Sequence, residues 1–241
     1  MRLSLQLFTI RDAMAADMEG TLAAVRATGL DYVELAGYYG KTAAEFAAIL
    51  ANHGLKVSGS HVGLDDLENH FQTVVDDSEA LGNQWVIVPW VSEERRNWPV
   101  LAKTLSELGD RLSTRGLKLA YHNHDFEFGP DQGMRQLMAN AGEHVKFQVD
   151  LGWVLFAGQD PAEFLRDVRG KAPLVHLKDM APDLDNPHVV AGEGAMNWPS
   201  VLEACSETNV LFGAIEMDRP PHDPLTDVKT CVQYFRARGL N

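Results

Sequence analysis

Polar side chains, all but one of them ionisable, recur at alternate positions in four short apolar segments of the second half of the chain. The four pairs are His122 and His124, Gln148 and Asp150, His176 and Lys178, and Glu216 and Asp218. Alternate residues of a β-strand share one face, so each pair would point to the same side of its strand. Buried charges are costly unless they are paired or bound to a cation. A cluster of such groups therefore marks a candidate functional site.

The residue types in this cluster indicate a metal site. Two carboxylates, Asp150 and Glu216, with the imidazole of His176 form a mixed oxygen and nitrogen set. Such a set suits Mn²⁺, Mg²⁺, Co²⁺ or Zn²⁺ with positions left for substrate oxygens. An iron–sulfur cluster or a structural zinc would need thiolates. The two cysteines, Cys205 and Cys231, form no such motif, and we expect both to be small buried residues.

Short apolar segments and helical patterns alternate along the whole chain. The expected strands are Leu3–Ile10, Tyr32–Gly37, Lys56–Gly63, Trp85–Trp90, Lys118–His124, Val145–Gly152, Leu174–Met180 and Phe212–Asp218. The expected helices are Asp17–Ala27, Thr42–Asn52, Leu67–Leu81, Pro99–Thr114, Gln132–Asn140, Pro161–Val168, Pro199–Thr208 and Pro224–Arg238. Four of these helices begin with proline, and glycines 29, 54 and 116 stand at expected helix ends.

This alternation predicts one domain over residues 1–241, a (β/α)8 TIM barrel of eight parallel strands. A doubly wound open sheet would usually show a glycine-rich turn after the first strand, and the chain has Thr9-Ile10-Arg11-Asp12 there. Active sites of such barrels lie at the carboxyl ends of the strands. We therefore expect the four polar pairs to meet at one end, joined by Gln6 and Glu34 from the first two strands.

The net charge of the chain limits the kinds of molecule that it is expected to bind. Lys and Arg number 21 and Asp and Glu number 34, which gives a net charge of −13. This field repels phosphate backbones, so no nucleic acid partner is expected. No apolar run reaches the ~18 residues of a membrane span, and Met1–Leu7 is expected to be a strand rather than a targeting segment. A cytoplasmic protein with a small-molecule sugar substrate is expected, and a homo-oligomer is left open.

At these residues the chain resembles the sugar phosphate isomerase/epimerase branch of the xylose isomerase-like barrel superfamily. The resemblance spans nearly the whole chain, with its motifs in order. They are Leu5–Thr9 with Arg11-Asp12, Tyr121–Phe128, Val149–Trp153, His176–Asp179, Gly192–Gly194 with Asn197-Trp198, and Ile215–Asp218.

The resemblance implies one divalent metal ion held by carboxylates and a histidine. Asp150, His176 and Glu216 match three of its ligands. Many relatives have a glutamate at the end of the fifth strand, where this chain has His122. Glu127, five residues later, is the first choice for the fourth ligand, and His122 or His124 is the alternative.

The resemblance also implies a reaction in which a proton is removed from a carbon beside a carbonyl. The metal would stabilise the enediolate that forms. Glu216 is expected to act as ligand and base, with His122 or His124 as partner acid or base. Lys178 would hold a substrate oxygen, or else pair with Asp150 or Asp179. The expected substrate-binding residues are Trp153, His61, Arg219 and Trp90.

Three classes of function follow. The first is an isomerase or epimerase acting on a small sugar, with a lyase or dehydratase acting on a keto-sugar or keto-inositol as its runner-up. The second is a non-catalytic sugar-binding barrel. The third, an endonuclease for abasic DNA, is disfavoured because Trp153 stands where those enzymes carry a metal-binding histidine. The long segment 181–194 after the seventh strand is expected to be a lid or a plain loop.

Overall fold

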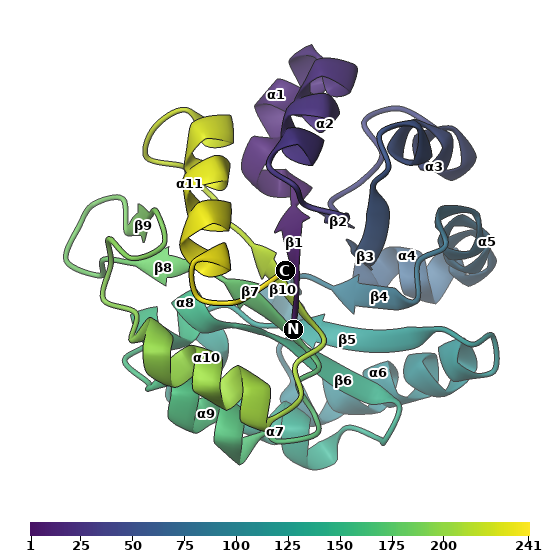
Figure 1. Ribbon diagram of the computed structural model, residues 1–241. Helices are drawn as coiled ribbons and strands as arrows, with labels where there is room; N and C mark the ends of the chain where they lie inside the picture. Colours follow the sequence, from purple (N-terminus) through teal and green to yellow (C-terminus); the bar gives the residue numbers. More distant parts are fainter.

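Eight parallel strands close into a barrel in the computed structural model, which describes residues 1–241. The strands are β1 (Arg2–Gln6), β2 (Tyr32–Leu35), β3 (Lys56–His61), β4 (Trp85–Val88), β5 (Lys118–His122), β6 (Val145–Asp150), β7 (Leu174–Leu177) and β10 (Phe212–Ile215). Strand β1 pairs with both β2 and β10, which completes the ring. The helices surround these strands (Figure 1). The predicted barrel and all eight of its strands are confirmed.

The helical segments also lie where the sequence predicts them. They are α2 (Met18–Ala27), α3 (Ala43–Asn52), α4 (Leu64–Asn69), α5 (Phe71–Leu81), α6 (Trp98–Ser113), α7 (Gly133–Asn140), α9 (Pro161–Asp167), α10 (Trp198–Glu207) and α11 (Pro224–Arg236). The expected helix Leu67–Leu81 is divided, because α4 ends before His70 and α5 begins after it. Helices α1 (Arg11–Ala16) and α8 (Leu151–Phe156) were not predicted. No helix combines the length and the apolar character that crossing a bilayer requires.

Local side-chain chemistry fixes where several helices begin. At α3 the Thr42 hydroxyl accepts a hydrogen bond from the backbone N–H of Glu45, while the Glu45 carboxylate accepts one from the N–H of Thr42. This reciprocal pair is a capping box. At α9 the Asp160 carboxylate accepts from the first free N–H groups, and Pro161 follows in the first turn. Such caps fix the residue at which each helix begins, and this limits how far the preceding segment can extend.

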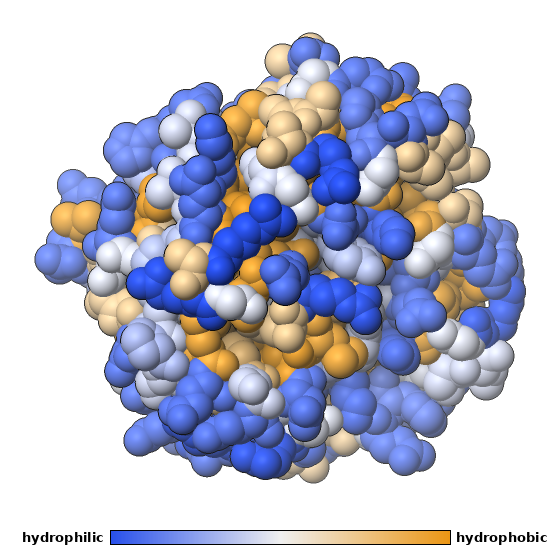
Figure 2. All heavy atoms as spheres, viewed as in Figure 1, coloured by the Kyte–Doolittle hydropathy of each residue, from blue (hydrophilic) through white to orange (hydrophobic).

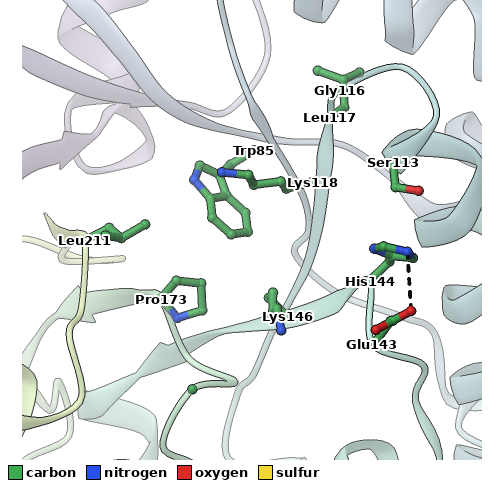
Figure 3. Close-up of a pocket in the computed structure, with 11 residues that line it drawn as sticks. Trp85, Ser113, Gly116, Leu117, Lys118, Glu143, His144, Lys146, Pro173 and Leu211 are labelled. Atoms are coloured by element: carbon green, nitrogen blue, oxygen red, sulfur yellow. Dashed lines mark ion pairs between the residues drawn. The ribbon is translucent and has the colours of Figure 1, made fainter.

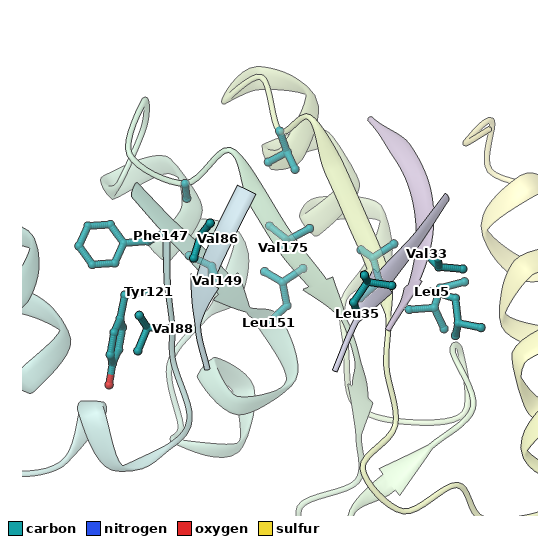
Figure 4. Close-up of a cluster of buried hydrophobic side chains, with 14 of the residues drawn as sticks. Leu5, Val33, Leu35, Val86, Val88, Tyr121, Phe147, Val149, Leu151 and Val175 are labelled. Atoms are coloured by element: carbon teal, nitrogen blue, oxygen red, sulfur yellow. The ribbon is translucent and has the colours of Figure 1, made fainter. Parts of the chain in front are cut away.

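The two faces of the strands have different partners. Outward-facing residues such as Val33, Leu35, Val149 and Val175 are fully buried in a continuous apolar cluster between barrel and helices (Figure 4). Because side chains alternate along a strand, the other residues of each strand point into the interior of the barrel. In β5, for example, Tyr121 lies in the outer cluster, whereas His122 points inward. The inward face carries polar groups toward the carboxyl ends.

The strands end earlier than the sequence predicts. The expected strand Leu3–Ile10 stops at Gln6 and continues as a 3-10 helix (Leu7–Ile10). Strand β6 stops at Asp150 because its carboxylate accepts the backbone N–H of Trp153 and thereby begins α8. Beyond Leu177 the chain forms β8 (Asp179–Met180), which pairs antiparallel with β9 (His188–Val189). The segment 181–194 therefore contains the returning strand of a short hairpin.

Candidate metal centre

Four side chains of metal-binding type converge inside the carboxyl end of the barrel. They are His122 from β5, Asp150 from β6, His176 from β7 and Glu216, which follows β10. One ligand atom of each lies within 4.8 Å of the others, and all four residues are buried. The register explains the meeting, because Asp150 pairs with His176 directly across β6 and β7. The structure thus brings together the predicted Asp150, His176 and Glu216.

Both ring nitrogens of His176 contact carboxylates. Its Nδ1 lies 2.7 Å from Glu216 Oε2 and 3.6 Å from Asp150 Oδ2. Its Nε2 lies 2.6 Å from Glu34 Oε1. Burial acts to lower the pKa of His176, but Glu216 and Glu34 outweigh it and raise that pKa well above the usual range. With Nε2 held by Glu34, Nδ1 is the nitrogen that would bind a cation in place of its contact with Glu216.

Glu34 of β2 is the centre of a hydrogen-bond network that holds this histidine. Its carboxylate accepts from the amide of Gln6 at 2.8 Å and from the amide of Gln148 at 2.6 Å. The Gln148 carbonyl in turn lies 3.0 Å from His61 Nε2 and 3.1 Å from His122 Nδ1. Sequence reasoning placed Glu34 at this end but assigned it no role. Its position at the inward face of β2 was the available signal.

Lys178 is fully buried and lies among three carboxylates. Its Nζ is 2.9 Å from Asp150 Oδ2, 2.8 Å from Glu216 Oε2 and 3.1 Å from Asp218 Oδ2. Burial opposes its charge, but Asp150 and Glu216 outweigh this effect and raise the pKa of Lys178 well above its usual value. Gly152 makes room for the lysine, because a Cβ there would lie 2.6 Å from Lys178 Cγ.

Asp179, the other acid considered for Lys178, has a different role. Its carboxylate accepts hydrogen bonds from the indole of Trp198 at 2.8 Å and from the backbone N–H groups of Gly192 and Met196. It therefore fixes the segment that returns from the β8–β9 hairpin to α10. The sequence marks Trp198 only as part of a motif, and the structure gives it this buried hydrogen-bond partner.

The donor set fits a divalent cation. Asp150 Oδ2 is buried and, although Lys178 Nζ is 2.9 Å away, it has no partner in hydrogen-bonding geometry. The carboxylate of Glu216 and the imidazoles of His122 and His176 surround this oxygen. Mixed oxygen and nitrogen donors of this kind bind Mn²⁺, Co²⁺ or Zn²⁺ readily. The residues present are thus consistent with the expected metal site.

Glu127, the first choice for the fourth ligand, lies outside this group. Its carboxylate accepts from the Tyr121 hydroxyl at 2.7 Å and from the backbone N–H of His124 at 2.8 Å. Burial raises the pKa of Glu127 to about 7. The alternative, His122, is the residue that the structure places with the other three. The ligand set itself stays a prediction.

A cavity of about 440 Å³ opens above the cluster. Its lining is Phe8, Ala36, His61, Pro89, Trp90, His122, His124, Glu216 and Asp218. Three of the four expected catalytic residues line it, and Lys178 lies beneath Glu216 and Asp218. Trp90 is 50% exposed and Phe8 is 40% exposed, so both rings are open to a ligand.

The other three residues expected to bind substrate differ in their position relative to the cavity. His61 lies in the cavity wall. Trp153 lies beside the cavity wall. The centre of its ring is 5.8 Å from that of His124 and 5.1 Å from Lys178 Nζ. Arg219 is exposed and does not line the cavity. Sequence reasoning missed Phe8 as a wall residue, because the first strand was expected to continue through it.

Sequence comparison finds one family and several curated relatives. The model of the family described as Xylose isomerase-like TIM barrel matches residues 22–237. The rhizopine catabolism protein MocC of Rhizobium meliloti is 24% identical over 255 residues, which covers 88% of this chain and 78% of that protein. Inosose dehydratase of Clostridium tetani is 31% identical over 172 residues, 63% of this chain and 57% of that enzyme. The chain therefore spans little more than half the length of this dehydratase.

Solved structures show the same fold. A sugar phosphate isomerase/epimerase from Parabacteroides distasonis superposes with a TM-score of 0.87 and 20% identity, over 98% of this chain and 97% of that one. A probable 3-DHS dehydratase, AsbF, from Bacillus anthracis gives 0.77 at 12% identity, over 99% and 100%. At such identities the likeness shows a shared fold alone.

Proposed function

The chain belongs to the xylose isomerase-like TIM barrel family, and from this premise we propose that it is a divalent-metal-dependent enzyme acting on a small sugar or keto-inositol. Its first step would remove a proton from a carbon beside a carbonyl. The observation that carries the proposal is the buried His122, Asp150, His176 and Glu216 cluster at the floor of the 440 Å³ cavity. These four residues would hold the cation. When bound, it supplies Lewis-acid stabilisation of negative charge that develops on substrate oxygens.

Glu216 is the proposed base. It is only 5% exposed but lines the cavity, so its carboxylate can reach a bound substrate while bulk water is largely excluded. The contacts from His176 and Lys178 both involve Oε2. Oε1 is therefore the oxygen left to accept the proton. Proton removal adds negative charge to the substrate, and the buried ammonium of Lys178 offsets part of that charge.

The cavity wall would orient the substrate. Trp90 and Phe8 offer aromatic faces for the apolar side of a sugar ring. His124 lies in the wall with its Nδ1 buried and unpartnered, which suits a substrate hydroxyl. Burial lowers the pKa of His124, so the ring is neutral at neutral pH and can both donate and accept a hydrogen bond.

Three outcomes share this first step. Return of the proton to the neighbouring carbon gives isomerisation, and return to the opposite face of the same carbon gives epimerisation. Loss of a β-hydroxyl instead gives dehydration: the C–O bond breaks, the proton taken up by Glu216 passes to the departing hydroxyl to form water, and the N–H of His124 would hydrogen-bond to that oxygen. The inosose dehydratases among the relatives support dehydration as the second candidate.

The test is proton exchange in D₂O. The protein is loaded with Mn²⁺, Co²⁺ or Zn²⁺, desalted and assayed for bound metal, and about one ion per chain is expected. It is then incubated with keto-hexoses, aldo-hexoses and inososes, and NMR follows loss of the proton beside the carbonyl. Glu216→Gln should abolish exchange. Absence of exchange with every substrate, despite bound metal, would remove the proposal. New sugar signals indicate isomerisation or epimerisation, whereas an unsaturated or dicarbonyl product indicates dehydration.

A further inference from the structure

A second hollow opens at the other end of the barrel, where the strands begin (Figure 3). It is a cavity of about 460 Å³ whose lining includes Trp85, Lys118, Lys146, Pro173 and Leu211. A smaller cavity of about 250 Å³ shares Trp85, Lys118 and Leu211 with it. The two therefore form one basin, called here the amino-terminal mouth. Its size matches that of ordinary small-molecule sites.

Strand alternation directs positive charges into this mouth. Lys118 lies four residues before His122 on β5, and Lys146 lies four residues before Asp150 on β6. Residues four apart on a strand share one face, so both lysines belong to the inward row that ends in the metal cluster. Arg2 occupies the corresponding place on β1, four residues before Gln6, and lines the smaller cavity. Three cations from three strands thus surround one opening.

These cations have no carboxylate partner. Arg2, Lys118 and Lys146 form no ion pair, although the chain carries 34 acidic residues against 21 Lys and Arg. The one acid in the larger lining, Glu143, lies 3.8 Å from His144 (Figure 3). Positive charge therefore collects at this mouth in an otherwise acidic protein, which favours an anionic ligand.

The floor of the mouth is aromatic and apolar. Trp85 is 5% exposed, and the ammonium of Lys118 lies 5.1 Å from the centre of its ring. Leu211, 46% exposed, and Pro173 lie on the side of Trp85 away from Ser113 and His144 (Figure 3). In the space-filling view, orange hydrophobic surface shows near the middle of the face on which both termini lie, crossed by blue side chains (Figure 2). A flat ring would cover this surface.

The mouth is separate from the metal cluster. Between them the barrel is filled by small and apolar side chains, among which Ile87, Ala120 and Leu174 are at most 1% exposed. The hydroxyls of Ser4 and Ser58 meet at 2.7 Å in the same layer. A ligand in the mouth would therefore not compete directly with the sugar substrate.

We propose that the amino-terminal mouth binds a planar organic anion. Its ring would lie against Trp85 and Leu211, and its carboxylate, sulfonate or phosphate would pair with Lys118 and Lys146. This site is independent of the reaction proposed above, and either can be present without the other.

The experiment uses naphthalene-1-sulfonate as the probe and isothermal titration calorimetry on the intact chain. The double variant Lys118→Gln/Lys146→Gln removes both cations and, because Lys118 is exposed and Lys146 is half-buried, should leave the fold intact. The matched control Lys103→Gln/Lys229→Gln removes the same charge from α6 and α11. Naphthalene-1-methanol supplies the same ring without charge.

The expected result is saturable binding of the sulfonate that the Lys118/Lys146 variant weakens about tenfold or more, the size of a lost charge-assisted hydrogen bond. The control variant should leave the affinity unchanged, and the neutral alcohol should bind about tenfold more weakly. Absence of binding to the unaltered chain would overturn the proposal. So would equal weakening in both double variants, or equal affinity for sulfonate and alcohol.

Discussion

Glu34 and His176 are separated by 142 positions in the chain, and their side chains meet at 2.6 Å inside the barrel. The contact joins β2 to β7 across the interior rather than between neighbouring strands. It fixes the imidazole so that Nδ1 faces Asp150 and Glu216. Carboxylates that orient a histidine ligand in this way strengthen metal binding although they do not touch the ion.

Glu34→Gln should therefore weaken metal binding while leaving the barrel folded. We expect affinity for Mn²⁺ or Zn²⁺ to fall about 10- to 100-fold, as for other partners of ligating histidines. Calorimetric titration of the metal-free protein measures the change. Glu45→Gln, which removes an exposed helix-capping carboxylate, is the control. An unchanged metal affinity in the Glu34 variant would show that the contact is structural alone.

The fourth ligand can be decided by comparing a variant at the end of β5 with one in the segment that follows it. His122→Gln should lower bound metal to well below one ion per chain, because it removes a nitrogen from the buried cluster. Glu127→Gln should retain the metal, because its carboxylate is held by Tyr121 and the backbone of His124. Elemental mass spectrometry after desalting makes the comparison. The reverse pattern would restore Glu127 as the ligand.

The barrel and most of the cluster were predictable because each depends on a repeated pattern. Alternation of apolar strands with helices predicts the closed sheet, and alternation within strands puts Asp150 and His176 on one face. Parallel strands then align their carboxyl ends without further information. These two patterns are enough to predict that residues at the carboxyl ends of the last four barrel strands lie close together.

Contacts that depend on the loops and on distant partners were not predictable. Glu34 gains its role from residues 114 and 142 positions away, and one glutamate in a short strand gives no sign of this. The position of Glu127 was equally unpredictable. The hydroxyl of Tyr121, on the outer face of β5, hydrogen-bonds its carboxylate and holds it outside the metal cluster. The early end of β6 is a capping effect of Asp150 that overrides the β-propensity of the residues after it.

Lys178→Met should destabilise the fold. The ammonium stands within 3.1 Å of Asp150, Glu216 and Asp218, so its loss leaves buried carboxylates facing one another. Removing one partner of a buried charge pair costs about 3–5 kcal/mol. Urea unfolding of the metal-free protein measures the loss. Lys229→Met, on the exposed side of α11, should change stability by less than about 0.5 kcal/mol. A Lys178 variant as stable as this control would contradict the charge balance inferred here.

The two cysteines should make the fold sensitive to alkali. Burial raises the pKa of Cys205 and of Cys231 to about 12 each, whereas an unfolded thiol ionises near pH ~8.5. The stabilisation is complete below the unfolded pKa and is lost as the pH rises toward 12, since only the unfolded chain releases protons in that window. Each thiol contributes a slope of about 1.4 kcal/mol per pH unit there. Between pH 8 and pH 10.5, the free energy of unfolding in urea should fall less for Cys205→Ala/Cys231→Ala than for the unaltered chain. An equal fall in both proteins would show that the buried thiols do not cause the sensitivity to alkali.

The charges around the 440 Å³ cavity predict that the substrate of the proposed reaction carries no phosphate. Glu216 and Asp218 line the cavity, and no Lys or Arg does. The Arg11 guanidinium is occupied by the carbonyls of Phe8 and Asp218, while Arg219 is exposed outside the lining. A phosphate ester carries nearly two negative charges at neutral pH, and the cavity wall has no Lys or Arg that would pair with it.

A matched pair of substrates tests this, for example fructose and fructose 6-phosphate in the D₂O exchange assay. The free sugar should react at least about tenfold faster per mole, because Glu216 and Asp218 repel the ester; this ratio corresponds to about 1.4 kcal/mol. Added salt should narrow the difference only slightly, since Glu216 and Asp218 are largely buried and buried charges are screened weakly. Faster exchange of the phosphate ester would contradict the charge argument while leaving proton abstraction intact. Arg219→Gln would then show whether that arginine moves to the phosphate, through a selective loss of the ester reaction.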